Sequence, residues 1–386
     1  MGKKFRALFC CGSRPELIKI APVIDHCHTL ENIDPLLCLT GQHRELLSCH
    51  LDYFNLIPQY RLNVLRQGQS LDQLMQLLFE QLPAVIEQAE PDIVIVQGDT
   101  ASALASAIMA HKANIPVAHI EAGLRTYDQN SPFPEEIYRQ SISKITKWHF
   151  CPTKRARQNL WDEKIPSETI FVTGNTAVDA VLKTMTAIKA DQNFSPLHLT
   201  NKPYFLITLH RRESQGAPLR RIVTCLLDFA NKRRNFGFVL PLHANPNTAD
   251  MIQKRLGQQP NIHLIPAVSY PHMVSLMARA FAIITDSGGI QEEAPSLNTP
   301  VIIVRENTER PEGIESGCLR LAGTRPDRIL YELNLLIDDP SHYNRMKCAE
   351  NPFGDGFAAQ RIAAHLQDIV TRHDIWKEKN NNDPSL

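Results

Sequence analysis

The feature that most constrains the fold of this chain is a regular alternation of short apolar runs with longer segments of helical periodicity. Such runs are typical of strands buried on both faces, and helical segments between them are typical of crossovers in parallel sheets. The pattern therefore predicts an α/β fold with two doubly wound, Rossmann-like domains. The predicted strands are Ala7–Cys11, Pro35–Thr40, Asp92–Gln97, Val117–Glu121, Trp148–Cys151 and Ile170–Thr173, then Tyr204–Leu209, Gly237–Leu242, Ile262–Ile265, Ala282–Thr285 and Val301–Val304.

The length of 386 residues exceeds one ordinary hydrophobic core and suits two domains. We expect an N-terminal domain over residues 1–173 and a C-terminal, nucleotide-binding domain over residues 174–359. Gly174 and Asn175 favour a junction there, because both residue types tolerate unusual dihedrals. A helix over about 360–373 is expected to pack back on the first domain, and the polar residues 374–386 are expected to fray.

Composition and charge exclude several classes of function. The 41 basic and 41 acidic residues give a formal net charge of zero, so nothing favours nucleic acid or an anionic membrane as a partner. The nine cysteines form no C-x-x-C pair and lie in apolar segments, which is typical of reduced thiols in a cytoplasmic protein. No apolar run approaches the roughly 18 residues of a membrane span, and the first run is too short for a signal peptide.

A glycine turn follows one of the predicted strands in the second half. Ser287, Gly288 and Gly289 lie between the apolar run that ends at Thr285 and a helical segment with Glu292 and Glu293. Glycines let the backbone approach an anion, and a helix start offers unpaired N–H groups and the positive end of its dipole. The pattern indicates a phosphate site with a carboxylate for ribose hydroxyls, although a purely structural turn is equally consistent with it.

Polar residues also follow the first-half strands, at the edge where such folds bind ligands. Arg14 and Lys19 open a helix after the first strand, where both could face a phosphate or a carboxylate or remain solvated. Asp99 and Glu121 end two apolar strands, where partial burial would suit them to acid–base chemistry. The alternative for Asp99 is the N-cap of the following Ala-rich helix.

Further charged residues complete a candidate cluster. Glu135 and Arg139 are spaced i, i+4 at the start of a helix, as a site pair or an ordinary surface pair. Three carboxylates in one cleft would need Arg14, Arg139 or His210 to reduce their repulsion. His210 follows a strand and could protonate a leaving phosphate, or it could be structural. No group of His, Cys or Asp has convincing metal-ligand spacing, so no metal is expected.

Taken in order, these motifs closely resemble the non-hydrolysing UDP-N-acetylglucosamine 2-epimerase family, over nearly the whole chain from Lys4 to about Leu366. The matching segments are Gly12-Ser13-Arg14-Pro15-Glu16-x-x-Lys19, Gly98-Asp99-Thr100, His119 to Thr126 and Pro134-Glu135-Glu136, followed by His210 to Ser214, Thr285 to Ser296, Thr308 to Glu312 and Asn351 to Gly356.

The resemblance implies a GT-B arrangement of the two Rossmann-like domains, with the active site in the interdomain cleft. It implies reversible inversion at C2 of UDP-GlcNAc to give UDP-ManNAc, by elimination of UDP to 2-acetamidoglucal and re-addition, without a cofactor. The product would supply ManNAc-type sugars for surface polysaccharide synthesis. Removing a weakly acidic C2 proton requires a base together with stabilisation of the departing diphosphate.

The family's residue roles carry over by motif. Asp99, Glu121 and Glu135 become the acid–base carboxylates, and His210 assists the UDP leaving group, while the order in which the carboxylates act stays open. The resemblance assigns the remaining substrate- and UDP-binding residues as Arg14, Lys19, Arg139, Ser287, Gly288, Gly289, Glu293 and Arg310, with Lys19 bracing the carboxylates.

Family members also suggest regulation and assembly. A second, allosteric UDP-GlcNAc site would use Gln42, Gln69, Glu136, Arg211 and His243. A homodimer is expected, with the apolar helix Leu71–Ile86 as one contact surface or, alternatively, packed on its own sheet. The alternatives for function are a GT-B glycosyltransferase using a UDP-sugar, an epimerase for another UDP-2-acetamido sugar, a hydrolysing epimerase that releases free ManNAc, and a non-catalytic nucleotide-sugar-binding protein.

Overall fold

The structure is a computed structural model that describes residues 4–41, 44–66, 68–197, 199–209, 216–242, 246–347 and 349–381. These residues form two compact units. The first is made of the described residues of Met1–Ala180 and Gly354–Leu386, and the second of those of Val181–Phe353. The boundary between the units falls within helix α7 (Thr176–Ala190), a few residues beyond the glycine at which the sequence favours a junction.

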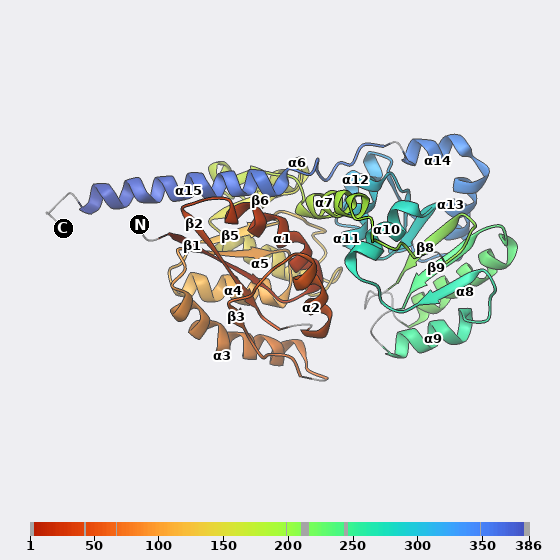
Figure 1. Cartoon of the computed structure of the whole chain (residues 1–386), viewed down its shortest axis with the longest axis horizontal. Helices are drawn as coiled ribbons and strands as arrows, with labels where there is room; N and C mark the ends of the chain where they lie inside the picture. Colours follow the sequence, from red (N-terminus) through yellow and green to blue (C-terminus); the bar gives the residue numbers. More distant parts are fainter. Residues whose placement is uncertain are drawn as a thin grey trace. The chain divides into compact units, whose positions relative to one another are not determined.

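The first unit is built on a seven-stranded parallel sheet (Figure 1). Its strands are β1 (Phe5–Cys11), β2 (Ile33–Leu39), β3 (Tyr60–Arg61), β4 (Ile93–Gln97), β5 (Val117–Ile120), β6 (Trp148–Cys151) and β7 (Ile170–Val172). Their order is β3-β2-β1-β4-β5-β6-β7. The chain winds outward in one direction from β1 and in the other from β4, so the switch point of the topology lies between these two strands.

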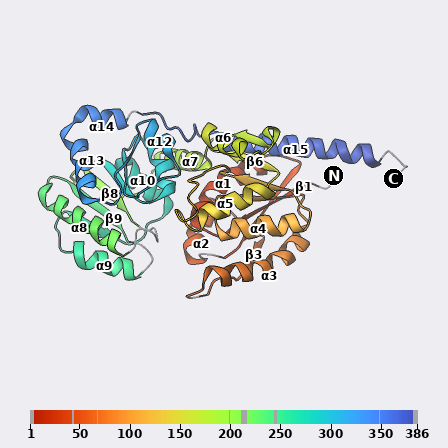
Figure 2. The same ribbon diagram turned by 180° about the vertical axis from the view of Figure 1, so that it is seen from behind.

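Helices cover both faces of this sheet (Figures 1 and 2). One apolar core joins the sheet to α1 (Arg14–His28), α2 (Arg44–Tyr53) and α15 (Ala358–Asn381). The other joins it to α3 (Leu71–Ala89), α4 (Ala101–Lys112) and α5 (Glu135–Ile145). Alternate β1 residues divide between them, with Phe9 in the first core and Leu8 in the second, as the two-residue period of a strand requires. The unit also contains α6 (Lys154–Asp162) and the short helix η1 (Ser167–Thr169).

Helix α15 brings the end of the chain back to the first unit. Its first backbone N–H groups, those of Ala358 and Ala359, donate to the Asp179 carboxylate at 3.2 and 2.7 Å. The His365 ring lies 4.1 Å from that of Phe171, between ring centroids. The helix continues to Asn381, whereas the sequence predicts fraying from 374. No glycine or proline interrupts the chain from Phe357 until Pro384, so nothing in its backbone chemistry ends the helix earlier.

The second unit contains a six-stranded parallel sheet in the order β10-β9-β8-β11-β12-β13. Its strands are β8 (Tyr204–Thr208), β9 (Gly237–Pro241), β10 (Ile262–Ile265), β11 (Ala282–Thr285), β12 (Val301–Ile303) and β13 (Leu319–Leu321). One core joins the sheet to α8 (Ala217–Lys232), α9 (Pro246–Leu256), α13 (Pro326–Asp338) and α14 (Pro340–Lys347). The unit also contains α10 (Tyr270–Arg279), α11 (Gly288–Glu293), η2 (Ala294–Leu297) and α12 (Pro311–Glu315).

The two parallel sheets with interleaved helices confirm the α/β class and the two Rossmann-like units. Every predicted strand is present. The sequence missed two edge strands, β3 and β13, because two or three residues are too few to show a strand period. The apolar stripe of α3, including Leu74, Leu78 and Leu82, is buried against its own sheet, which was the alternative to a dimer contact. Within the described part of the chain, no helix combines the length and apolarity needed to cross a bilayer.

Candidate active site

The polar residues singled out in the first unit gather at the carboxyl ends of β1, β4 and β5. Gly12 and Ser13 follow β1, the turn Gly98–Thr100 follows β4, and Glu121 follows β5. These strands are neighbours around the switch point, where doubly wound sheets bind their ligands. The local sequence therefore delivers several charged side chains to one edge of one sheet.

Glu121 is held by a cation and an amide. Its Oε2 lies 2.5 Å from the Lys19 ammonium, and both side chains are only 7% exposed. The Gln97 amide donates to the same oxygen. The ammonium and the amide stabilise the ionised carboxylate in this buried position. Sequence reasoning missed Gln97, although a polar residue ending the apolar run Ile93–Val96 was a usable signal.

The backbone of Glu121 is unusual. Its φ of 67° is in the left-handed region, which is costly for a residue with a side chain. Because no helix starts at Glu121, capping does not explain this conformation. It directs the carboxylate to the group formed with Lys19 and Gln97. Strain of this kind persists where the surroundings over-determine a side-chain position, and it clusters at functional sites.

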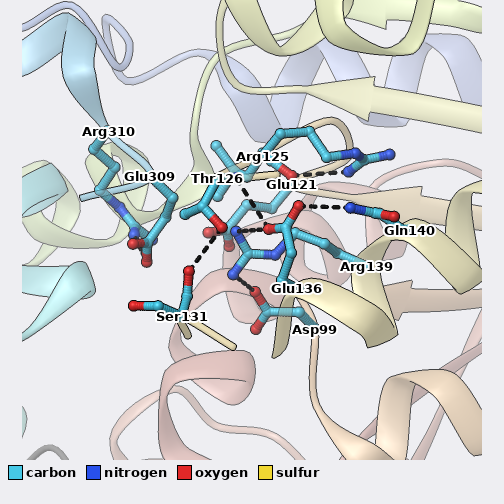
Figure 3. A network of polar contacts seen from close by, with 12 residues as sticks. Asp99, Glu121, Arg125, Thr126, Ser131, Glu136, Arg139, Gln140, Glu309 and Arg310 are labelled. Carbon is cyan, nitrogen blue, oxygen red and sulfur yellow. Dashed lines mark hydrogen bonds and ion pairs between the residues drawn. The ribbon is translucent and has the colours of Figure 1, made fainter. Parts of the chain in front are cut away.

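A second ionic network surrounds Arg139 of α5 (Figure 3). Its guanidinium is 3% exposed and pairs with Asp99, whose side chain is 26% exposed, and with Glu136 at 3.4 Å. The alternative of Asp99 as the N-cap of α4 is wrong, because Thr100 accepts the Ala103 N–H at 3.0 Å instead. Asp99 therefore presents a partly exposed carboxylate, neutralised by one buried cation.

Glu136 fixes the loop that follows β5. It is fully buried, and its two oxygens accept from the backbone N–H groups of Thr126 and Tyr127, each at 3.0 Å. The Gln140 amide donates to it at 2.8 Å (Figure 3). These contacts hold the loop that begins with Glu121 against α5, so the carboxylate of Glu136 has a positioning role in this unit.

Glu135 and Arg14 occupy helix starts. Glu135 is the first residue of α5 and Arg14 the first of α1, and both are partly buried. Burial, followed by the nearby charge of Glu135, raises the pKa of the Tyr138 hydroxyl, which lies one turn along α5. Glu135 thus lies on the helix that also carries Arg139, the partner of Asp99.

His119 and Glu16 are buried titratable groups beneath this edge. His119 Nε2 lies 2.7 Å from the carbonyl oxygen of Gly98, and burial lowers the pKa of its ring to about 3, so the ring is neutral and donates to that oxygen. Glu16 is 1% exposed, and burial raises the pKa of its carboxyl to about 7 against the opposing effect of its hydrogen bonds. In the sequence Glu16 is one member of the segment Gly12 to Lys19, and no role at the site was assigned to it.

In the second unit, α11 begins at the expected glycine turn. The Ser287 N–H donates to Thr285 Oγ1 at 2.9 Å, and that hydroxyl lies 2.6 Å from Thr208 Oγ1 at the end of the neighbouring strand. Two buried threonines therefore fix the start of the turn. A Cβ on Gly288 would meet Arg310 Nη1 at 2.7 Å, whereas a Cβ on Gly289 would meet nothing within 4 Å. Of these two glycines, only Gly289 has open space where a side chain would begin.

Arg310 is part of a buried ionic chain. Its Nε donates to Glu292 at 2.6 Å, its Nη1 pairs with Glu309, and Glu309 pairs with Arg305 at 3.0 Å. The positive charges of Arg305 and Arg310 are thus balanced by the negative charges of Glu292 and Glu309, all within the second unit. The helical pattern offered both Glu292 and Glu293 as ribose ligands, and the family resemblance selected Glu293. Glu292 is engaged with Arg310, while Glu293 is contacted by the Tyr270 hydroxyl at 3.4 Å.

Four of the predicted site residues, His210, Gln42, Arg211 and His243, lie outside the described residues. Among those that are described, no three His, Cys, Asp or Glu side chains group as metal ligands. A cavity of about 740 Å³ in the first unit is lined by Phe5, Trp148 and His365, at the amino ends of the strands. It therefore lies at the opposite edge of the sheet from the charged cluster.

Two Rossmann-like units, one with carboxylates paired to cations at its switch point and the other with a glycine turn opening a helix, define a two-domain α/β enzyme of the nucleotide-binding kind. A family model described as UDP-N-acetylglucosamine 2-epimerase matches residues 25–367. The chain belongs to this UDP-N-acetylglucosamine 2-epimerase family.

Individual relatives agree with this assignment. The UDP-N-acetylglucosamine 2-epimerase of Salmonella typhimurium is 42% identical over 371 residues, which cover 94% of this chain and 98% of the relative. The crystal structure of UDP-GlcNAc 2-epimerase from Neisseria meningitidis bound to UDP-GlcNAc matches with a TM-score of 0.90 at 40% identity, covering 95% of this chain and 100% of that one. The Methanocaldococcus jannaschii enzyme in complex with UDP-GlcNAc and UDP matches with a TM-score of 0.84 at 33% identity, covering 94% and 99%.

Proposed function

We propose that this protein interconverts UDP-GlcNAc and UDP-ManNAc by eliminating the C2 proton and UDP to give 2-acetamidoglucal, and then re-adding UDP at C1 and a proton at the opposite face of C2. The observation that carries the proposal is the pair of neutralised carboxylates, Glu121 with Lys19 and Asp99 with Arg139, at the switch point of the first unit. Family membership supplies the substrate class, since relatives are named for, and crystallised with, this nucleotide sugar.

The chemistry assigns these residues complementary tasks. Removing the C2 proton requires a base that is ionised before it acts, and two carboxylates of the site are each paired with a buried cation, Lys19 or Arg139. Asp99, Glu121 and Glu135 would exchange protons with the sugar, in an order that stays open. His210 would assist departure of the diphosphate.

The second unit would hold the nucleotide. The turn Ser287-Gly288-Gly289 would hold the diphosphate at the start of α11, with the backbone N–H groups of Gly288 and Gly289 offered to it, and Glu293 would accept hydrogen bonds from the ribose hydroxyls. The charge of Arg310 is already balanced by Glu292 and Glu309, which supports a role in shaping the turn under Gly288. Arg14, at the start of α1, would contribute charge toward the substrate.

One experiment tests the reaction class. We would incubate the protein with UDP-GlcNAc in deuterated water and follow the products by NMR. Epimerisation through the glycal predicts UDP-ManNAc carrying deuterium at C2. Free ManNAc would instead identify a hydrolysing enzyme, and sugar transfer to an acceptor without C2 exchange would identify a glycosyltransferase. If deuterium enters C2 of a different UDP-2-acetamido sugar and not C2 of UDP-GlcNAc, the protein is an epimerase of the same class with another substrate.

Two finer properties belong to the same proposal. An allosteric UDP-GlcNAc site would include Gln69 and Glu136, with Gln42, Arg211 and His243 completing it. A homodimer is expected from the family, and sedimentation of the purified protein at several concentrations measures it. None of the eight described cysteines forms a disulfide, and seven of them are buried, which supports a reducing, cytoplasmic location.

A further inference from the structure

A single buried carboxylate connects two loops of the proposed active site. Glu16 Oε2 accepts from the backbone N–H of Ser13 at 2.7 Å and from that of Gly12 at 3.2 Å, both in the loop after β1. Its Oε1 accepts from the Thr100 hydroxyl at 2.8 Å, in the turn after β4. The two oxygens thus bind opposite sides of the switch point.

Ordinary helix capping explains only part of this arrangement. A glutamate at the third position of a helix commonly accepts from the N-cap N–H, and the bond to Ser13 does this. Capping requires neither near-complete burial nor a bond to a residue 84 positions away in the sequence. Burying a carboxylate in this way is costly, and a surface cap would avoid that cost.

Both partners of Glu16 are next to residues assigned to the chemistry. Thr100 directly follows Asp99, and its hydroxyl also accepts the Ala103 N–H at 3.0 Å, so it links Glu16 to the first turn of α4. Lys19, which pairs with Glu121, lies one turn beyond Glu16 on α1. A shift of α1 relative to the β4–α4 turn would therefore move Lys19 and Asp99 apart.

We propose that Glu16, acting through Thr100, is a positioning residue that sets the distance between Asp99 on one loop and the Lys19–Glu121 pair on the other. It touches neither the substrate nor the reacting atoms. The inference rests on the proposed function, because it assigns a purpose to the geometry of those carboxylates.

Thr100→Val is the sharpest variant, because it keeps the shape of the side chain and removes the bond to Glu16. Misplacing a reacting group by a fraction of an ångström is expected to lower kcat by about tenfold to a hundredfold, with KM and UDP affinity within about threefold of wild type. Thr100→Ser restores the hydroxyl and is expected to restore kcat to within about threefold. The loss of kcat in Glu16→Ala should not add to that in Thr100→Val, because both variants break the same bond between Glu16 and Thr100.

Thr153→Val is the matched control. The Thr153 hydroxyl accepts the Ala156 N–H at 3.1 Å at the start of α6, which follows β6 of the same sheet. Removing this hydroxyl therefore removes an N-cap equivalent to the one that Thr100 provides for α4. We expect unchanged kcat for this variant. Equal kcat losses in the two valine variants, or additive losses in the double variant, would overturn the positioning role.

Hydrogen exchange separates this inference from the proposed function. Removing the Thr100 hydroxyl should speed amide exchange in peptides that span residues 12–16, whereas Thr153→Val should leave them unchanged. Unchanged exchange in Thr100→Val would overturn the connection itself. A wild-type protein that forms no C2-labelled product would refute the proposed reaction, and the exchange result would still decide whether Glu16 joins the two loops.

Discussion

At the scale of single residues, the clearest expectation concerns the two neutralised carboxylates. Asp99→Asn and Glu121→Gln each remove a group that exchanges protons with the sugar, while leaving the glycine turn of the second unit intact. We expect turnover to fall by about 10²- to 10⁴-fold and UDP affinity to stay within about tenfold. Single-turnover assays and calorimetric titration with UDP measure the two quantities. A parallel loss of UDP affinity would contradict the assignment.

Glu16 also makes stability depend on pH. Its folded-state pKa, raised by burial to about 7, exceeds the ordinary value of 4.5, so folding favours the protonated form. The stabilisation from this group is complete below about pH 4.5 and is lost as pH rises through about 7. The Glu16→Gln variant has no ionisable group at this position, so it does not lose this stabilisation as pH rises. Urea unfolding of both proteins between pH 5 and 8 should show the free-energy difference moving in favour of the variant as pH rises, and a constant difference would refute it.

At the scale of one element, the start of α11 separates structural from binding roles. Gly288→Ala would place a Cβ 2.7 Å from Arg310, whose guanidinium is held by Glu292 and Glu309. We expect a loss of about 1–3 kcal/mol in the free energy of unfolding. Gly289→Ala has room for its methyl group and is expected to keep stability while weakening UDP binding, because the methyl enters the proposed phosphate space. Equal stability losses in the two variants would contradict the account.

Helix α15 is expected to be an integral part of the first unit. Leu366 is fully buried in the core that this helix shares with β1 and α1, so Leu366→Ala should cost about 2–5 kcal/mol. Truncation after residue 372 keeps every α15 residue of that core, the last of which is Val370, and should leave the melting temperature unchanged. Calorimetry on the two proteins provides the comparison, and a harmless Leu366→Ala would show that the helix packs loosely.

For the whole molecule, sequence patterns predicted the positions of most strands along the chain, because parallel strands buried on both faces leave strong apolar runs. They also selected Lys19, Asp99, Glu121 and Arg139 as residues near one edge. They did not reveal which cation pairs with which carboxylate, since pairing depends on the positions of α1 and α5 against the sheet. The neutralisation of Arg310 was equally hidden, because Glu292 reaches it from α11, 18 residues earlier in the chain, and adjacency alone does not predict that Glu309 pairs with it.

The return of α15 to the first unit has a consequence for synthesis of the chain. The core between β1, α1 and α15 includes Ala359, Ile362, Ala363 and Leu366, which leave the ribosome after the whole second unit. The second unit is continuous in sequence over Val181–Phe353 and contains every strand of its own sheet. Because domains generally fold as units during translation, the middle of the chain can complete its core first. The part of the first unit made earlier, which already has α1 and α2 against this core, must wait until α15 emerges, and the apolar surface that α15 covers is open to chaperones in the meantime.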